Sequence, residues 1–196
     1  MRRFYSQRYK KRVIILGPGE YFASKDGEIL YTVLGSCIAV CIYDIEKKIG
    51  GMNHYLLPGM IHRDEILTSK LGRYGMYAME LLIGEFIKYG TRRENLIAKI
   101  FGGGNVLKFR RSDGDITGSN IHFAKKFLEL EGIPVQSEDL GGYCGRKILF
   151  FTDTAKVLLK QFDVKKNQKI FDKERTYKGM VLHKRRAVPS GSVILF

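Results

Sequence analysis

Short apolar stretches separated by turn residues recur along the chain, and each of them predicts a β-strand. Residues 37–43 and 49–57 flank the polar residues 44–48 and predict a β-hairpin. Apolar residues return at helical spacing in 71–89 and 121–130, which predicts two main helices, the second capped by Ser119 or Asn120. The order of these elements predicts an α/β domain with mixed or antiparallel sheets. Further strands are expected at 13–16, 28–33, 96–101, 133–140, 147–152 and 156–162.

The hairpin brings a cysteine and a histidine together. A two-residue loop at 45–46 pairs Asp44 with Lys47 and places Cys37 directly opposite His54, and a four-residue loop at 44–47 keeps the same register. Directly opposed residues point to one face with Cβ atoms about 4.5–5.5 Å apart, close enough for a hydrogen bond between thiol and imidazole. The hairpin therefore predicts a nucleophile and base pair in a groove open to a substrate amide.

A structural interpretation of the same residues stays open, because strand cysteines are commonly buried and strand histidines commonly serve packing. Cys41 falls on the face of Cys37, beside Gly50, and is expected in the core. Gly35 and Ser36 give the backbone before Cys37 the freedom to turn N–H groups toward an oxyanion.

Other reactive residues give weaker signals. His62 and His122 are expected at the surface, and Cys144 is expected to be a spare thiol in a glycine-rich loop. The glycines at 102–104 follow a strand without a phosphate-binding motif, so they indicate a close approach between backbones.

The composition, with 44% hydrophobic residues in 196, favours one globular domain without a membrane span or secretory leader. Three cysteines form neither a disulfide framework nor a zinc motif, which favours a reducing cytoplasm. The net charge of +14 lies at the two ends, with six cations in 1–12 and a net of eight in 156–196. We therefore divide the chain into a basic N-terminal arm (1–12), a folded domain (13–162) and a basic, flexible C-terminal tail (163–196).

Basic ends suit acidic partners, among them an anionic membrane surface or an acidic protein, although they also serve solubility alone. Phe4, Tyr5 and Tyr9 alternate with basic residues, as in some nucleic-acid-binding segments. No nucleic-acid-binding motif accompanies them, so nucleic acid is disfavoured as a partner.

Five motifs in this order resemble those of the CheD family of chemoreceptor glutamine deamidases: LGSCIAVCIYD, GGMNHYLLPG, RYGMYAMELLIGEF, AKIFGGGNVL and DLGGYCGRKILFF. The resemblance covers about residues 13–160. It implies a three-layer α/β/β sandwich of the CheD type, with mixed or antiparallel sheets and two main helices. It also implies a cysteine hydrolase that converts receptor glutamines to glutamates, with Cys37, His54 and Thr32 as catalytic residues and with neither metal nor cofactor.

The resemblance further implies chemoreceptor cytoplasmic domains as substrates, a CheC-type phosphatase as a partner and a cytoplasmic location. Thr117 and Ser119 depart from the family pattern, which has a glycine and an arginine there, and this affects substrate preference more than chemistry. The alternative function is a catalytically divergent binding module that associates with chemotaxis proteins.

Overall fold

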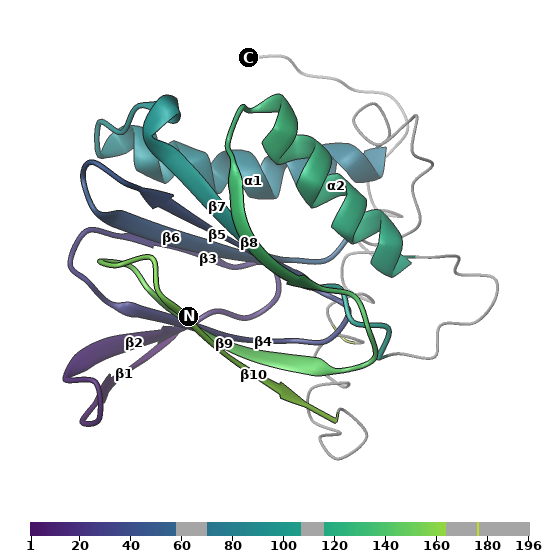
Figure 1. Cartoon of the computed structure of the whole chain (residues 1–196), viewed down its shortest axis with the longest axis horizontal. Coiled ribbons are helices and arrows are strands. Elements are labelled where there is room, and N and C mark those ends of the chain that lie inside the picture. Colours follow the sequence, from purple (N-terminus) through teal and green to yellow (C-terminus); the bar gives the residue numbers. More distant parts are fainter. Residues whose placement is uncertain (58–69, 107–115, 164–175, 177–196) are drawn as a thin grey trace.

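The computed structural model describes residues 1–57, 70–106, 116–163 and 176. Two five-stranded sheets form most of this part of the chain (Figure 1). The first sheet has the order β1-β2-β4-β9-β10, and the second has the order β3-β6-β5-β7-β8. Both are mixed, because β2 pairs with β4 and β7 with β8 in parallel while their other pairs are antiparallel. The predicted α/β class with mixed sheets is confirmed.

The strands of the first sheet are β1 (Arg2–Ser6), β2 (Lys11–Ile15), β4 (Ile29–Leu34), β9 (Gly145–Phe151) and β10 (Val157–Phe162). Those of the second sheet are β3 (Tyr21–Ser24), β5 (Ile38–Asp44), β6 (Ile49–Tyr55), β7 (Leu96–Gly102) and β8 (Val135–Leu140), and the short 3₁₀ turn η2 (Arg93–Asn95) precedes β7.

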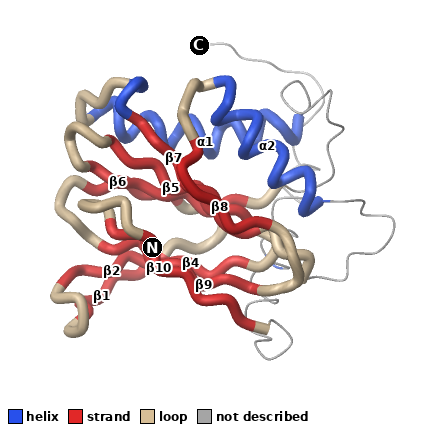
Figure 2. Tube along the Cα trace, in the orientation of Figure 1, coloured by secondary structure: helices blue, strands red, loops and turns tan. Residues whose placement is uncertain are grey.

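The helices α1 (Lys70–Lys88) and α2 (Ile116–Leu130) lie on one side of the second sheet, and the first sheet lies on its other side (Figures 1 and 2). The helical stripe predicted for α1 is confirmed, since its apolar members Met79, Leu82, Ile83 and Phe86 are all buried. The helix ends before Gly90, whose φ of 71° suits a residue without a side chain.

The start of α2 differs from the prediction. The helix begins at Ile116, so Ser119 and Asn120 lie inside it and not at its N-cap. Asn120 instead is fully buried, where its Oδ1 accepts a hydrogen bond from the Leu57 N–H at 2.8 Å and its carbonyl accepts one from the Tyr55 hydroxyl at 3.2 Å. These bonds attach the helix to the end of β6.

Strand alternation builds two apolar layers on the two faces of the second sheet. In β5, Ile38, Val40 and Ile42 pack against the helices, because alternate residues of a strand point to opposite faces. Cys37, Ala39 and Cys41 pack on the other face against the first sheet. The expected site residues near Cys37 therefore belong to the layer between the two sheets.

Two strands escaped prediction. The basic range 1–12 contains β1 and the first two residues of β2, which pair as a hairpin at the edge of the first sheet. β1 carries Arg2, Arg3, Phe4 and Tyr5 with all four exposed, so it has no alternation to reveal it. β3 spans only four residues and follows a turn, which also gives little pattern.

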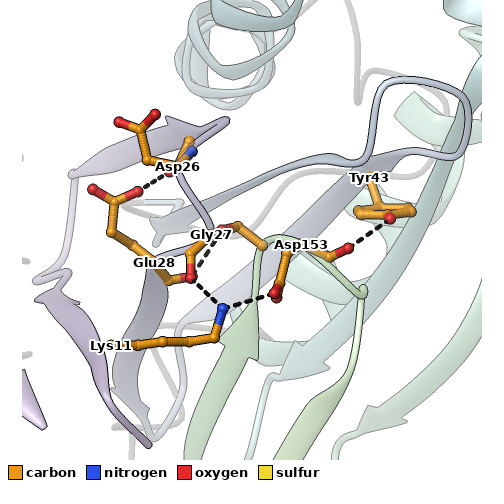
Figure 3. A network of polar contacts seen from close by, with 8 residues as sticks. Lys11, Asp26, Gly27, Glu28, Tyr43 and Asp153 are labelled. Carbon is orange, nitrogen blue, oxygen red and sulfur yellow. Dashed lines mark hydrogen bonds and ion pairs between the residues drawn. The ribbon is translucent and has the colours of Figure 1, made fainter.

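Polar contacts also join the two sheets at the end of β5 away from Cys37. On the side of the first sheet, Lys11 Nζ donates to the Gly27 carbonyl at 2.9 Å and to the Asp153 carboxylate at 2.7 Å (Figure 3). The Tyr43 hydroxyl of the second sheet donates to the Asp153 carbonyl at 3.0 Å. These residues form what we call the far junction: Lys11, Gly27, Tyr43 and Asp153.

Several expectations lie outside the described residues. They concern His62, the loop at 110–115 and all of the C-terminal tail except residues 163 and 176.

Candidate active site

The turn of the β5–β6 hairpin sets the register of the site, and it differs from the predicted turn. Asp44 pairs with Ile49, so four residues, 45–48, form the loop. The buried Asp44 carboxylate accepts hydrogen bonds from the N–H groups of Glu46 and Lys47, each at 2.9 Å. Lys48 then takes a φ of 57° and donates its N–H to the Asp44 carbonyl at 2.9 Å. This turn shifts the pairing by two residues from the prediction.

The predicted direct opposition of Cys37 and His54 is therefore wrong. Ala39 is the residue opposite His54, and Cys41 lies opposite Met52 instead of Gly50. A shift of two residues leaves every side chain on its predicted face, whereas a shift of one would reverse them all. Cys37 and His54 thus share one face of the second sheet as diagonal neighbours, an arrangement with typical separations of about 7–8 Å between backbones.

Thr32 reaches His54 from the opposite sheet. Its Oγ1 lies 2.7 Å from His54 Nδ1 and 2.7 Å from the Leu16 carbonyl oxygen. A hydroxyl has one proton, and a carbonyl oxygen can only accept, so the Thr32 proton must point to Leu16. Oγ1 then accepts the Nδ1–H of His54. This arrangement protonates Nδ1 and makes Nε2 the nitrogen with the basic lone pair.

The site is buried, in contrast to the open groove expected from the sequence. Cys37 and Thr32 have no exposed surface, and His54 is 2% exposed. Apolar side chains of the layer between the sheets surround this region, among them Leu34, Leu56 and Phe101. A substrate amide can therefore reach the sulfur only when neighbouring atoms move.

The glycines at 102–104 press against the segment that carries the cysteine. Gly103 N–H donates to the Cys37 carbonyl at 2.8 Å, and Gly104 N–H donates to the Gly35 carbonyl at 2.7 Å. Gly102 has a φ of 113°, and a Cβ there would lie 2.1 Å from the Cys37 carbonyl oxygen. The close backbone approach predicted for this glycine run is confirmed, and it fixes the backbone on both sides of Ser36.

Comparison with known proteins identifies the family. A sequence model of the family described as CheD chemotactic sensory transduction matches residues 56–161. A protein of Shewanella oneidensis named probable chemoreceptor glutamine deamidase CheD 1 is 40% identical over 96% of this chain and 89% of its own length. The chain belongs to the CheD family. The resemblance drawn from its motifs is confirmed.

Two further CheD relatives support this assignment. A probable chemoreceptor glutamine deamidase CheD from Laribacter hongkongensis is 39% identical over 98% of this chain and 92% of its own length. One of the same name from Methylobacillus flagellatus is 44% identical over 82% of this chain and 79% of its own length. The similarity to CheD proteins thus extends over nearly the whole chain.

Sequence reasoning missed two features beside this candidate site. Leu16 acts through its carbonyl, which no side-chain pattern reveals, although the turn residues Gly17-Pro18-Gly19 mark the place. Arg146 is 3% exposed, and its guanidinium holds Asp139 at 2.6 Å and the Gly141 carbonyl at 2.9 Å. In the loop that contains Gly141, the Gly142 carbonyl accepts a hydrogen bond from the Asn105 N–H at 2.7 Å. This loop therefore supports the glycine turn beside Cys37.

The two other cysteines of this CheD chain differ in their surroundings: Cys41 is the other diagonal neighbour of His54 on the same face, and the Cys144 carbonyl lies against Gly104. Cys41 is buried in the layer between the sheets, as predicted. Burial raises the pKa of the Cys41 thiol well above its ordinary value, and the positive charge of Lys99 opposes the shift only in part. Cys144 is half-buried in the loop before β9. His122 is half-buried on α2.

Within the described residues, no three His, Cys, Asp or Glu side chains gather where they could hold a metal ion. The helices in this part of the chain are also too short or too polar to span a bilayer.

Proposed function

We propose that this member of the CheD family is a protein-glutamine glutaminase that converts glutamine side chains of chemoreceptor cytoplasmic domains to glutamate in chemotaxis. The names of its relatives give the substrate class. We further propose that Cys37, His54 and Thr32 carry the reaction on a three-layer α/β/β sandwich of the CheD type. The observation that supports this most is the double contact of Thr32 Oγ1 with His54 Nδ1 and the Leu16 carbonyl.

The first half of the reaction forms a thioester. His54 Nε2 takes the proton of the Cys37 thiol, and the thiolate attacks the carboxamide carbon of the glutamine side chain. Backbone N–H groups near Ser36 suit the developing oxyanion. The tetrahedral intermediate then breaks its C–N bond as His54 returns the proton to nitrogen, and ammonia leaves.

The second half returns the enzyme to its starting state. His54 takes a proton from water, the resulting hydroxide attacks the thioester carbon, and the C–S bond breaks to release glutamate. The proton goes back to the sulfur. Thr32 takes no part in proton transfer, because its own proton is committed to Leu16. It holds the imidazole so that Nδ1 stays protonated and Nε2 is the nitrogen that takes up and returns the proton.

The buried sulfur adds a requirement to this proposal. Cys37 has no exposed surface, so a receptor glutamine must displace neighbouring atoms before attack. A water-excluded site strengthens the interaction between thiolate and imidazolium and keeps competing nucleophiles away from the thioester.

Mass spectrometry of a chemoreceptor cytoplasmic fragment tests the proposal. The wild type should convert glutamines to glutamates, and Cys37→Ala and His54→Ala should each abolish the conversion while circular dichroism stays unchanged. Cys144→Ala is the matched control and should keep full activity, since Cys144 contacts Arg146 and Gly104 through its main-chain carbonyl, which the substitution keeps. A Cys37→Ala protein that still deamidates the fragment would refute the assignment.

One observation favours a second function. A sealed thiol is also what a catalytically divergent binding module would have, acting on chemotaxis proteins such as a CheC-type phosphatase. The same experiment separates the two functions. If the protein is a binding module, even the wild type will leave every glutamine of the fragment unchanged. Binding measured by calorimetry would then remain in Cys37→Ala.

A further inference from the structure

The turn formed by residues 16–20, between β2 and β3, contacts both polar members of the site. The Leu16 carbonyl accepts the Thr32 hydroxyl at 2.7 Å. Gly19 N–H donates to the His54 carbonyl at 2.7 Å, and His54 N–H donates to the Glu20 carbonyl at 2.9 Å. This turn therefore holds the main chain of the histidine on both sides and also orients the hydroxyl that orients its ring.

The side chain of Glu20 closes this turn. Its Oε2 accepts the Gly17 N–H at 2.8 Å, while the Glu20 N–H donates back to the Gly17 carbonyl at 3.1 Å. Gly19 has a φ of 83°, which a residue with a side chain would adopt only with strain. The shape of the turn thus depends on two bonds between Gly17 and Glu20 and on one glycine.

Glu20 is not part of the reacting group itself. Its carboxylate bonds to Gly17 N–H and, at 2.6 Å through Oε1, to the Met1 ammonium, and about a third of the side chain is exposed. Its influence can reach the imidazole only through the main chain of the turn, by way of Leu16 and Thr32 on one side and of the His54 backbone on the other.

We propose that Glu20 is a positioning residue for the proposed deamidation. Its carboxylate holds the turn so that the Leu16 carbonyl takes the Thr32 proton and leaves Oγ1 to accept Nδ1–H of His54. If the turn relaxes, Leu16 retreats, and the freed Thr32 proton can point to Nδ1 instead. The imidazole proton then moves to Nε2, where it blocks the uptake of the Cys37 proton. This inference rests on the proposed function.

The bond to Gly17 requires an acceptor and no charge. In Glu20→Gln the amide oxygen can still accept Gly17 N–H, whereas Glu20→Ala removes the acceptor. The comparison of these two variants isolates the closing bond from the ion pair with the Met1 ammonium. Glu85→Ala is the matched control, because Glu85 lines the same surface cavity as Glu20 but bonds to Lys88 on its own helix.

The experiment measures kcat and KM for deamidation of the receptor fragment, together with ¹⁵N NMR of histidine-labelled protein. Glu20→Ala should lower kcat about tenfold or more with KM nearly unchanged, because misplacement of a catalytic group reduces rate more than affinity. Its His54 signals should show protonated Nε2. Glu20→Gln and Glu85→Ala should keep the wild-type kcat and protonated Nδ1.

Three outcomes overturn the inference, and the first two are a wild-type kcat in Glu20→Ala and a Glu20→Gln variant as impaired as Glu20→Ala. A purely structural role would lower the melting temperature without moving the proton of His54, and that result also contradicts it. Failure of the proposed function is recognised separately, because Cys37→Ala would then stay active or the wild type would be inactive, while the NMR comparison still tests Glu20.

Discussion

The two sheets are joined by polar side chains at opposite ends, and the two junctions use different chemistry. At the far junction, the Tyr43 hydroxyl of the second sheet donates to the Asp153 carbonyl, and the Asp153 carboxylate forms an ion pair with Lys11 of the first sheet, with side chains 39% and 30% exposed. At the proposed catalytic end, Thr32 of the first sheet and His54 of the second form a hydrogen bond with almost no exposure. Solvent can stabilise the charges at the far junction. The buried polar atoms of Thr32 and His54 depend instead on well-directed hydrogen bonds within the protein.

This difference explains why only one junction can hold a proton in a defined place. A lysine ammonium has three protons and rotates among acceptors, so its contacts with Gly27 and Asp153 fix no single donor. The Thr32 hydroxyl has one proton, already directed to Leu16, and this settles the role of the imidazole beside it. The Lys11 ammonium can therefore change its hydrogen-bond acceptor, whereas the Thr32 hydroxyl is held in one orientation.

The largest effect is expected from closing the space beside the nucleophile. Gly102→Ala places a Cβ 2.1 Å from the Cys37 carbonyl oxygen at a φ of 113°. We expect a loss of about 3 kcal/mol or more in the free energy of unfolding, measured by urea denaturation, and loss of deamidation. Gly84→Ala, which meets nothing within 4 Å, should be at least as stable as the wild type.

Gly50→Ala makes the same change near the far junction, where the Cβ would lie 2.5 Å from Thr152 Cα. This variant should lose stability but keep kcat per folded molecule, because Gly50 lies at the other end of β6 from His54. Equal stability of Gly102→Ala and the wild type would contradict the close approach.

Thr32→Val should have the next largest effect. Valine keeps the shape but leaves the Leu16 carbonyl and His54 Nδ1–H without their buried partner, each at a cost of about 1–3 kcal/mol. We expect kcat to fall about 10- to 100-fold, since the imidazole is no longer held in one tautomer. Thr32→Ser keeps the hydroxyl and should retain most activity. A Thr32→Val enzyme with wild-type kcat would remove Thr32 from the mechanism.

The hairpin shows how far the sequence could predict this site. Strand alternation placed Cys37 and His54 on one face correctly, because a side-chain face depends only on whether a position is odd or even. The register was wrong because it depends on the turn, where the Asp44 carboxylate binds two N–H groups and Lys48 adopts a left-handed conformation. Neither feature follows from hydrophobic pattern.

The fold was predictable to a similar degree. Strands with a buried face, such as β5 and β7, were predictable from their apolar residues. Strand β1 was not, because all its residues but Ser6 are exposed. The contact of Leu16 with Thr32 joins residues sixteen positions apart through a carbonyl. That bond depends on the parallel pairing of β2 with β4, and the Thr32–His54 contact depends on the packing of the two sheets. No local pattern specifies either.

A smaller effect is expected from Cys41, midway between the junctions. Because burial raises its pKa in the folded chain, the thiol ionises first in the unfolded chain as the pH rises. The free energy of unfolding should therefore fall above about pH 8.5, by up to about 1.4 kcal/mol per pH unit. Urea denaturation of Cys41→Ala between pH 8 and 10 should show a flatter decline. An unchanged slope would show that Cys41 ionises alike in both states.

The smallest effect is expected at the far junction. Lys11→Met removes an ion pair that is about one-third exposed, so the loss of stability should be about 0–1 kcal/mol. The kcat for deamidation should not change, because Lys11 lies at the end of the sheets away from Cys37. A loss of activity matching that of Thr32→Val would mean that the two junctions are coupled, and it would contradict their independence.

The most direct test is the position of the proton on His54. In ¹⁵N NMR of histidine-labelled protein, with the His54→Gln variant to assign the signal, Nδ1 should be protonated and donate its hydrogen bond to Thr32. Nδ1 must carry a proton whether Nε2 is neutral or has already taken the Cys37 proton. An unprotonated Nδ1 with the proton on Nε2 would contradict the account, because the imidazole could not then act as the base for the thiol.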